Sequence, residues 1–448
     1  MGTATLIASI AWISISAFQY GYHISSLNSA ADAVRTAIGL STFEFGVVTS
    51  AYTLGGLASS VHSAKMIDSW GQKKTAERAA CAMCVGALFV TIAHSFWLLT
   101  LGRVVIGLAC GIATVLVPLY LQTVSPRAIA AKVGILCQIS INLGILAAQG
   151  ISIPFSTPGT EKWRRISFLS VIVAVVQFGT GWLVASPSPA PPSHAYDHPA
   201  STTRDEERAP FILPEPDSTT TTTTTTTADK VETLTITEVL ASRDESVTRP
   251  LKALVATMLF QQFSGINAVM FYSVTILTAV NPASAKATAL FVTVVNLVMT
   301  FPAVYLIDRV GRRTLVVASL ATMSASSAVL AYSINRGDYV VASAGILAFV
   351  VSFAAGLGPV PFVLLGELPT PEAKSATASI AVASNWISNL VVGIAFLPLR
   401  DWLASLFTAA GARLDGDGAA AAPGSGTVFY VFAVVSAVGA VVVGRLLR

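Results

Sequence analysis

The stretch that decides the fold is Gln261–Ser273, which reads QQFSGINAVMFYS. It lies inside an apolar run that extends from about Leu251 to about Val280, long enough to cross a bilayer as one helix. Polar side chains at membrane depth are costly, and they usually face the interior of a helix bundle or a water-filled cavity. The polar residues of this stretch include Gln261, Gln262, Ser264, Asn267 and Tyr272.

These polar residues fit the lining of a binding site. On a continuous helix, Gln261 shares a face with Ser264 and Gly265, and Ser264 shares one with Asn267. Several amide donors and acceptors without a charge suit an uncharged, polyhydroxylated ligand. For any single residue the alternative is a hydrogen bond between helices, which is common for Gln, Asn and Ser in membrane bundles.

Composition assigns the whole chain to the membrane. Of its 448 residues, 54% are hydrophobic and only 11% are charged, whereas soluble domains carry roughly 25% charged residues. Cysteine adds no metal or redox site, because all four cysteines fall inside apolar segments. Even Cys81-x-x-Cys84 has no second pair, so we expect its thiols to behave as small hydrophobic side chains. The sequence predicts an all-α membrane protein that crosses the bilayer many times.

Twelve apolar segments are arranged as six, a long polar interval, and six more. The segments are 5–27, 43–66, 79–97, 98–122, 130–153, 164–185, 251–280, 285–307, 313–334, 339–367, 374–399 and 427–446. They predict an N-terminal six-helix bundle at 1–185 and a C-terminal six-helix bundle at 251–448. The interval 186–250 contains SPSPAPP and an unbroken threonine run, so we expect it to be mostly disordered. Near its end, Thr235 and Glu238 have the spacing of a capping box and predict a short helix.

The two groups of segments repeat one another. Asp68-x-x-Gly71 follows the second segment, and Asp308-x-x-Gly311 follows the eighth. A direct repeat of six spans is typical of transporters whose site lies between the two halves. The short loops on the side of both termini carry the greater number of Lys and Arg, which predicts that both termini are cytoplasmic.

With these motifs together, the chain resembles the sugar porter family of the major facilitator superfamily over nearly all twelve segments. The residues that carry the resemblance are Gln19–Tyr22, Gly102-Arg103, Val117-Pro118, Ser125-Pro126, QQFSGINAVMFYS, Asp308–Arg313, GLGPVPFVLLGEL at 356–368, and Ser384-Asn385-Trp386 with Asn389. The stretches YGYH at 20–23, INLGILAAQ at 141–149 and GLGPVPF at 356–362 are similar to a fungal branch found at the vacuole. The resemblance implies the major facilitator fold, with twelve transmembrane helices in two six-helix halves.

The family's sugar contacts can be transferred to this chain by motif. The resemblance implies substrate binding by Gln138, Gln261, Gln262, Asn267, Asn296, Phe353, Phe362, Asn385, Trp386 and Asn389. These residue types fit the role, because amides bond hydroxyl groups and aromatic faces pack against the C–H face of a sugar ring. The run Gly356–Pro361 should bend the tenth helix, which acts as a gate in the family.

A second set of residues resembles the family's cytoplasmic latch and gate. It comprises Asp68, Asp308, Arg309, Arg312, Arg313, Glu367, Lys374, Gly358, Pro359 and Pro361. The N-terminal half departs from the family here, with Ser69 and Gln72 in place of arginines and Thr123 in place of a glutamate. Ala130 replaces a further arginine. Since such latches hold the outward-facing state, these departures predict a preference for inward-facing conformations, or a relative that does not transport.

His23 and Arg103 are the ionisable residues predicted to lie well inside the membrane, and they form a possible pH-sensitive pair. In proton-coupled members of the family an aspartate stands where this chain has His23. A carboxylate can exchange its pairing with arginine for a proton, but a histidine beside arginine cannot do so in the same way. We therefore interpret His23 as a neutral hydrogen-bonding residue and favour facilitated diffusion.

The sequence predicts a transporter of a hexose-like sugar that works by alternating access. The alternatives are a transport-inactive sugar sensor or trafficking-related relative, and a proton-coupled carrier of a sugar or polyol. No catalytic set, phosphate-binding loop, metal site or cofactor site is expected, and no nucleic acid. The expected partners are a small sugar and the lipid bilayer, and the chain is expected to be a monomer in the vacuolar or plasma membrane.

Overall fold

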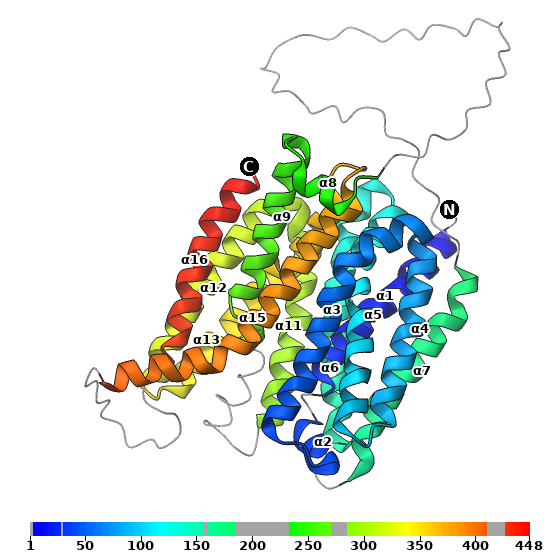
Figure 1. Cartoon of the computed structure of the whole chain (residues 1–448). Helices are drawn as coiled ribbons and strands as arrows, with labels where there is room; N and C mark the ends of the chain where they lie inside the picture. The colour runs from blue at the N-terminus through cyan, green and yellow to red at the C-terminus, as the bar shows by residue number, and fades with distance from the viewer. Residues whose placement is uncertain are drawn as a thin grey trace, which may run out of the picture. The chain divides into compact units, whose positions relative to one another are not determined.

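The computed structural model describes residues 3–27, 30–155, 157, 160–184, 233–269, 285–409 and 426–448, and in these ranges the regular structure is helical. The first helices are α1 (Thr3–Ser25), α2 (Ala31–Ile38), α3 (Thr42–Trp70), α4 (Gln72–Thr91), α5 (Phe96–Val124), the 3₁₀ turn η2 (Arg127–Ile129), α6 (Ala130–Phe155), the 3₁₀ turn η3 (Glu161–Trp163), α7 (Arg164–Thr180) and the 3₁₀ turn η4 (Gly181–Leu183). The later helices are α8 (Ile236–Ala241), α9 (Glu245–Phe263), α11 (Ala285–Arg309), α12 (Arg312–Asn335), α13 (Tyr339–Ser352), the π-helix η6 (Phe353–Leu357), α14 (Val360–Glu367), α15 (Lys374–Ala409) and α16 (Val428–Leu446). Figure 1 shows the long helices running side by side.

Helices lie at the predicted apolar segments. In the described ranges, nine helical segments are long and apolar enough to cross a membrane, and α3, α4 and α9 occupy the other three predicted positions. The third segment, predicted at 79–97, is displaced, because α4 begins at Gln72 and ends at Thr91. The first two turns of α4 contain Lys73, Lys74, Glu77 and Arg78, so the start of the helix is not apolar and was not recognised from hydropathy. At the other end, Ser95 caps the next helix, α5, by accepting a hydrogen bond from the Leu98 N–H. The expected disorder of the 186–250 interval stays a prediction, because residues 185–232 lie outside the described ranges. At the end of the interval the helix starts before the predicted position 251, since α9 begins at Glu245.

Glycine turns occupy the same place in the two halves of the repeat. Gly71 joins α3 to α4 with φ 77° and ψ 160°, and Gly311 joins α11 to α12 with φ 86° and ψ 153°. This backbone region is accessible essentially to glycine alone. The sequence repeat is therefore also a structural repeat, and the end of the bundle that carries these turns is called the glycine-turn end.

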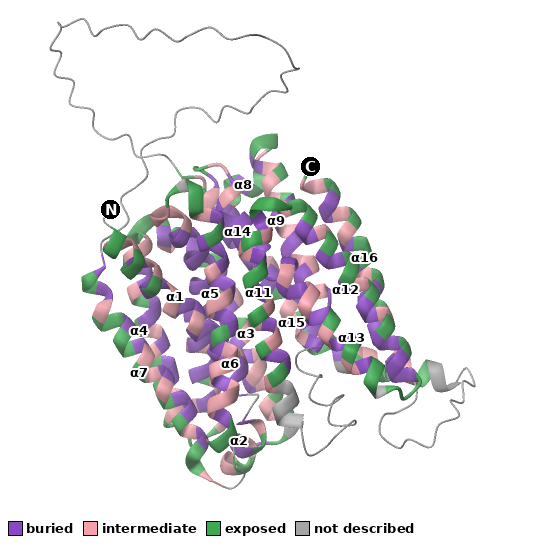
Figure 2. Ribbon diagram, turned by 180° about the vertical axis from the view of Figure 1, so that it is seen from behind, coloured by how far each residue is buried: buried purple, intermediate pink, exposed green. Residues whose placement is uncertain are grey.

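The N-terminal helices (α1 and α3–α7) pack on one another, and the C-terminal helices (α9 and α11–α16) do likewise. The two groups meet where α3 contacts α15 and where α6 contacts α11. Close helix contacts need small residues: a Cβ at Gly107 would lie 2.2 Å from the Tyr52 carbonyl oxygen, and one at Gly144 would lie 2.0 Å from that of Phe18. Among the nine apolar segments α5 is the most enclosed, with 83% of its most apolar window buried (Figure 2).

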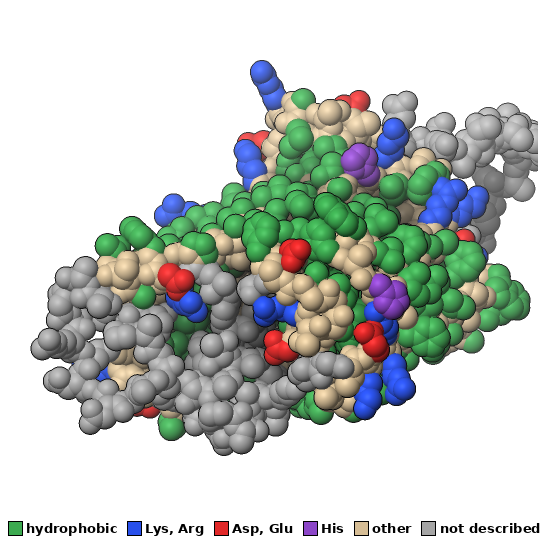
Figure 3. Space-filling view, turned by 60° about the horizontal axis from the view of Figure 1, so that its bottom comes forward, with side chains coloured by type: hydrophobic (Ala, Val, Ile, Leu, Met, Phe, Trp, Pro, Cys, Tyr) green, Lys and Arg blue, Asp and Glu red, His purple; other side chains and the backbone are tan. Residues whose placement is uncertain are grey.

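The outward faces of the helices are apolar. Exposed residues of α7 include Phe168, Ile172 and Val176, and those of α16 include Val434 and Val438. Figure 3 shows hydrophobic side chains covering much of the flank in view. A water-soluble protein does not display such continuous apolar faces, so these surfaces are lipid-facing.

The short helix near residue 236 is present as the capping-box spacing predicts. The Thr235 hydroxyl accepts from the Glu238 N–H, and the Glu238 carboxylate accepts from the Thr235 N–H at 2.7 Å. These bonds lower the pKa of the Glu238 carboxyl below its usual range. Val239 of α8 packs with Ala373 and Ala376 beside the start of α15. The helix thus attaches the chain before α9 to the glycine-turn end.

Candidate functional site

The amide-rich stretch at Gln261 does not form one continuous helix. α9 ends at Phe263, and Gly265 has φ 88°, so the prediction that Gln261, Ser264 and Asn267 lie along regular helical turns is wrong. A Cβ at Gly265 would lie 2.6 Å from the Phe432 ring of α16, so glycine is required both by the dihedral angle and by the neighbouring ring. Tyr272 lies outside the described residues.

Gln261 bonds the interrupted part of the tenth span. As predicted, that span is not a regular helix: α13 gives way to a π-helix, and α14 starts only at Val360. Pro361 has no N–H to donate to the Leu357 carbonyl four residues earlier. The Gln261 side-chain amide donates to that carbonyl at 2.8 Å and to the Gly358 carbonyl at 3.2 Å. Gln261 therefore makes the interhelical bonds that the sequence left open as an alternative.

A chain of side-chain amides continues from Gln261. Asn385 of α15 donates to the Gln261 side-chain oxygen at 2.7 Å and accepts from Gln262 at 3.0 Å. The Gln262 oxygen in turn accepts from Asn267 at 2.7 Å. Four predicted contacts from α9, the residues after it, and α15 thus form one uncharged network, called the Gln262 network.

A second amide cluster joins the N-terminal and C-terminal helices. Gln138 of α6 donates to Asn142 at 3.0 Å, and Asn142 donates to the Thr300 hydroxyl of α11 at 2.9 Å. Asn296 of α11 also donates to Asn142, at 3.3 Å, while its own side-chain oxygen is buried and has no partner in the described part of the chain. Gln138 and Asn296 were predicted, but Asn142 was missed. The available signal was its place one helical turn after Gln138.

Trp386 lies against the N-terminal helices. Its indole N–H donates to the Thr114 hydroxyl of α5 at 3.3 Å. Its ring centroid lies 5.7 Å from that of Tyr20 and 5.6 Å from that of Tyr52. A Cβ at Gly56 would be 2.6 Å from the Trp386 ring, so α3 also contacts it closely. Neither tyrosine nor Gly56 was predicted.

The remaining predicted contacts differ in their surroundings. Phe353 of η6 and Phe362 of α14 are both buried in the main core. Asn389 is half-buried on α15, and no hydrogen bond joins its side chain to another described residue. Among the described residues no hydrogen bond links the Gln262 network to the Gln138 cluster.

His23 and Arg103 are both buried, but their side chains do not pair. The His23 Nε2 lies 2.6 Å from the Ser170 hydroxyl, which donates to the Gln19 side-chain oxygen at 2.8 Å. Arg103 donates to the backbone oxygen of His23 at 3.2 Å, and its guanidinium carbon lies 4.3 Å from the centroid of the Tyr52 ring. His23 therefore has an uncharged hydrogen-bonding partner. Arg103 is stabilised by a backbone carbonyl and by the face of an aromatic ring.

At the glycine-turn end, only some of the predicted latch residues form ion pairs. Arg312 contacts Glu367 through two hydrogen bonds, of 3.0 and 3.1 Å, and lies 3.9 Å from Asp308. Arg309 instead stacks on Tyr305, and Arg313 donates to the Gly444 backbone oxygen at 2.8 Å. Among the described residues Lys374 takes part in no ion pair.

Contacts at this end also join the two groups of helices. Lys132 lies 3.2 Å from Asp308, and the Ser375 hydroxyl lies 3.0 Å from both carboxylate oxygens of Asp68. Gln122 of α5 donates to the Val363 backbone oxygen at 2.6 Å. Two of the residues that depart from the family contact each other within the N-terminal helices, since Gln72 donates to the Thr123 hydroxyl at 3.1 Å. A neutral hydrogen bond thus occupies the place where the resemblance implied an ion pair. The two groups of helices are in contact with each other at the glycine-turn end.

The fold and the buried polar networks define a helical membrane transporter of the major facilitator class. The sequence profile of the Sugar (and other) transporter family matches residues 4–447, and the chain belongs to this family. It is 28% identical to solute carrier family 2, facilitated glucose transporter member 3, of Rattus norvegicus, over 88% of this chain and 85% of the relative. It is 24% identical to vacuolar protein sorting-associated protein 73 of Saccharomyces cerevisiae, over 97% and 91%.

Solved structures support the fold. The structure of the proton:xylose symporter XylE bound to 6-bromo-6-deoxy-D-glucose aligns with a TM-score of 0.75 at 16% identity, covering 98% of this chain and 95% of that one. Its membership of the sugar transporter family makes the chain an integral membrane protein that crosses the bilayer many times.

Proposed function

We propose that this protein moves a hexose-like sugar across a membrane by facilitated diffusion. The Gln262 network carries the proposal: Gln261, Gln262, Asn267 and Asn385 present amide groups with no charged side chain among them. Such amide groups can exchange their hydrogen bonds to one another for hydrogen bonds to uncharged hydroxyl groups, and no charge has to be desolvated. The related glucose transporter named above and the sugar-transporter family favour a sugar over other uncharged solutes.

The binding residues would come from both groups of helices. Trp386 offers an aromatic face beside Tyr20 and Tyr52, which suits packing against the C–H face of a sugar ring. The buried side-chain oxygen of Asn296 is an acceptor without a partner among the described residues, which suits donation by a sugar hydroxyl. Bonds such as Gln138 to Asn142 would exchange for bonds to substrate as the two groups of helices move.

The surroundings of His23 support uniport rather than proton coupling. Proton coupling beside a buried arginine needs a group that is stable both as an anion paired with it and as a neutral acid. Arg103 instead donates to the carbonyl of His23, and the His23 ring bonds Ser170. Protonating that ring would bring a second positive charge next to Arg103.

The orientation and the location of the protein can be proposed from its basic residues and from its relatives. We infer that the glycine-turn end is cytoplasmic, because it carries Arg309, Arg312 and Arg313 together with Lys132. The vacuolar or plasma membrane is the proposed location, and the vacuolar name of a relative favours the former. The protein acts as a monomer, without catalysis, cofactor or nucleic acid.

Uptake of radiolabelled glucose by proteoliposomes tests the proposal. The wild type should equilibrate glucose saturably, and a pH gradient of either sign should not concentrate it. Gln262→Ala should abolish saturable uptake. Gln177→Ala is the matched control, since Gln177 is a buried amide of α7 that bonds Trp12 and Ser16 away from the proposed site.

Each other outcome points elsewhere. Accumulation driven by the pH gradient would make the protein a proton symporter and overturn the interpretation of His23. If neither wild type nor variant transports, glucose binding is measured by tryptophan fluorescence. Binding without uptake would identify a sugar sensor, which the altered latch residues Gln72 and Thr123 first suggested.

A further inference from the structure

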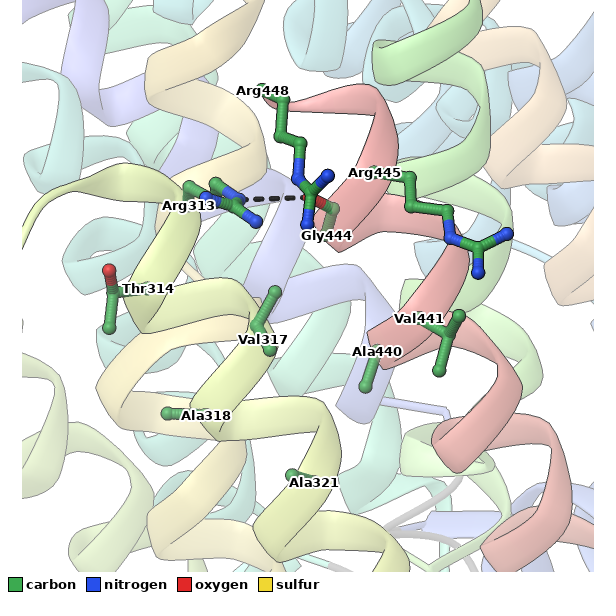
Figure 4. Close-up of a pocket in the computed structure, with 10 residues that line it drawn as sticks. All are labelled: Arg313, Thr314, Val317, Ala318, Ala321, Ala440, Val441, Gly444, Arg445 and Arg448. Atoms are coloured by element: carbon green, nitrogen blue, oxygen red, sulfur yellow. Dashed lines mark hydrogen bonds between the residues drawn. The ribbon is translucent and has the colours of Figure 1, made fainter.

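A groove lies on the outside of the C-terminal helices, between α12 and α16. Its volume is about 490 Å³, within the range of about 300–1,000 Å³ that is usual for ligand sites. It is lined by Arg313, Thr314, Val317, Ala318 and Ala321 of α12 and by Ala440, Val441, Gly444, Arg445 and Arg448 at the end of α16 (Figure 4). None of these residues belongs to the proposed sugar site.

One end of the groove is cationic. Arg313, Arg445 and Arg448 are all exposed. Arg313 is held in place because its Nε donates to the Gly444 backbone oxygen at 2.8 Å. In the described part of the chain, no ion pair involves any of these three arginines. Three cations that no described carboxylate neutralises favour an anionic ligand.

The rest of the groove is apolar and faces lipid. Ala318 and Ala321 of α12 and Ala440 of α16 line this part, and their short side chains leave a channel on the surface where the two helices meet. Val441 is 55% exposed on its edge. An apolar channel on a lipid-facing surface suits an alkyl chain, because its walls make van der Waals contacts along the chain.

The order of the two parts matches a phospholipid. α12 starts and α16 ends at the glycine-turn end, so the arginines lie where the helices leave the hydrocarbon, and the alanines lie deeper. We propose that this groove binds an anionic phospholipid. Its phosphate contacts Arg313, Arg445 and Arg448, and one acyl chain runs along the alanines towards Ala321.

Native mass spectrometry of the purified full chain tests this proposal. The protein is released from micelles that contain equal amounts of phosphatidylserine and phosphatidylcholine, and the bound lipid is identified. The wild type should retain phosphatidylserine preferentially. Arg445→Gln with Arg448→Gln should reduce that retention about tenfold or more, since each basic residue at an anionic surface contributes roughly a fivefold change in affinity.

The charge-matched control is Arg243→Gln with Arg249→Gln. Both residues are exposed near the start of α9, close to the same end of the bundle, and line no part of the groove. This pair should retain the wild-type lipid. Equal losses in the two double variants, or equal retention of the two lipids by the wild type, would overturn the proposal.

A third variant separates a lipid from a soluble anion. Ala440→Leu fills the channel and keeps every charge, so it should weaken phosphatidylserine retention while leaving the circular dichroism spectrum and melting temperature unchanged. Soluble glycerophosphoserine, added in large excess, should not displace the lipid. Displacement by this headgroup alone, with no effect of Ala440→Leu, would mean that the arginines bind a phosphate-bearing solute and that the acyl-chain assignment is wrong.

Discussion

Asn142 is the residue on which the Gln138 cluster depends. It bonds Gln138 on its own helix and both Thr300 and Asn296 on α11, so its removal leaves several buried polar groups without partners. Each unsatisfied buried group costs about 1–3 kcal/mol. The proposed sugar site therefore depends on a residue that is itself absent from the set of contacts implied by the family.

We expect Asn142→Ala to lower both thermal stability and glucose uptake, by about 2–5 kcal/mol in stability. Asn389→Ala should lower glucose affinity alone, because Asn389 has no hydrogen bond to another described residue that could be lost. Thermal unfolding in detergent, with and without glucose, measures both effects. If Asn389→Ala proved as destabilising as Asn142→Ala, the hydrogen-bond argument would fail.

Gly265 is a second residue on which local structure depends, and for two separable reasons. Alanine there must adopt φ near 88°, at a cost of about 1–2 kcal/mol, and its Cβ must also displace the Phe432 ring. We expect Gly265→Ala to cost more than that dihedral penalty, and to cost only the penalty when Phe432→Ala is already present. A double-mutant cycle of melting temperatures measures the difference. Gly393→Ala on α15 is the control, since nothing lies within 4 Å of its added methyl group.

At the scale of elements, the tenth span and α9 are coupled through one amide. Pro361 removes a donor from the Leu357 carbonyl, and Gln261 supplies one from a different helix. The interruption of the tenth span therefore requires a hydrogen-bond donor, which Gln261 of α9 provides. This coupling explains why two sequence features that lie almost a hundred residues apart behave as one.

Restoring the missing N–H should weaken that coupling. In Pro361→Ala the backbone can satisfy Leu357 internally, so Gln261→Ala should destabilise the variant by about 1–2 kcal/mol less than it destabilises the wild type. Urea or thermal unfolding of the four proteins gives the interaction energy. Additive effects would show that Gln261 does not compensate for the proline. Transport should slow in Pro361→Ala, because a continuous tenth helix bends less readily.

Much of the whole molecule could be predicted from sequence, because hydropathy and repeats report local properties. Gly71 and Gly311 were recognisable as equivalent because the Asp-x-x-Gly spacing repeats, and both adopt backbone angles that are accessible essentially to glycine alone. Contacts between helices that are distant in sequence could not be predicted, because they depend on which helix faces pack against each other. The bond from Trp386 to Thr114 is of this kind, as is the bond from Gln72 to Thr123, where two departures from the family compensate each other. The altered latch had predicted an inward-facing preference, yet the contacts Asp68–Ser375, Gln122–Val363 and Lys132–Asp308 join the two groups of helices at the glycine-turn end.

At the scale of the whole molecule, we expect Gln122 to stabilise the closed glycine-turn end more than the ion pair between Lys132 and Asp308 does. Lys132 and Asp308 are 47% and 41% exposed, and such surface pairs contribute about 0–1 kcal/mol. Gln122 is more enclosed, it donates to Val363 at 2.6 Å, and its side chain packs against Gly366. Removing it takes away a hydrogen bond worth about 0.5–1.5 kcal/mol and the packing with it.

The populations of the open and closed states can be compared directly. Spin labels at Ser69→Cys and Glu372→Cys, in a background without the native cysteines, report the separation of α3 and the loop before α15. We expect Gln122→Ala to increase the long-distance population several-fold and Asp308→Asn to change it little. The opposite ranking would place the closure in the ion pair, which would then have to be far less hydrated than its exposure indicates. Equal, unchanged distances in both variants would mean that the Asp68–Ser375 contact holds this end without either.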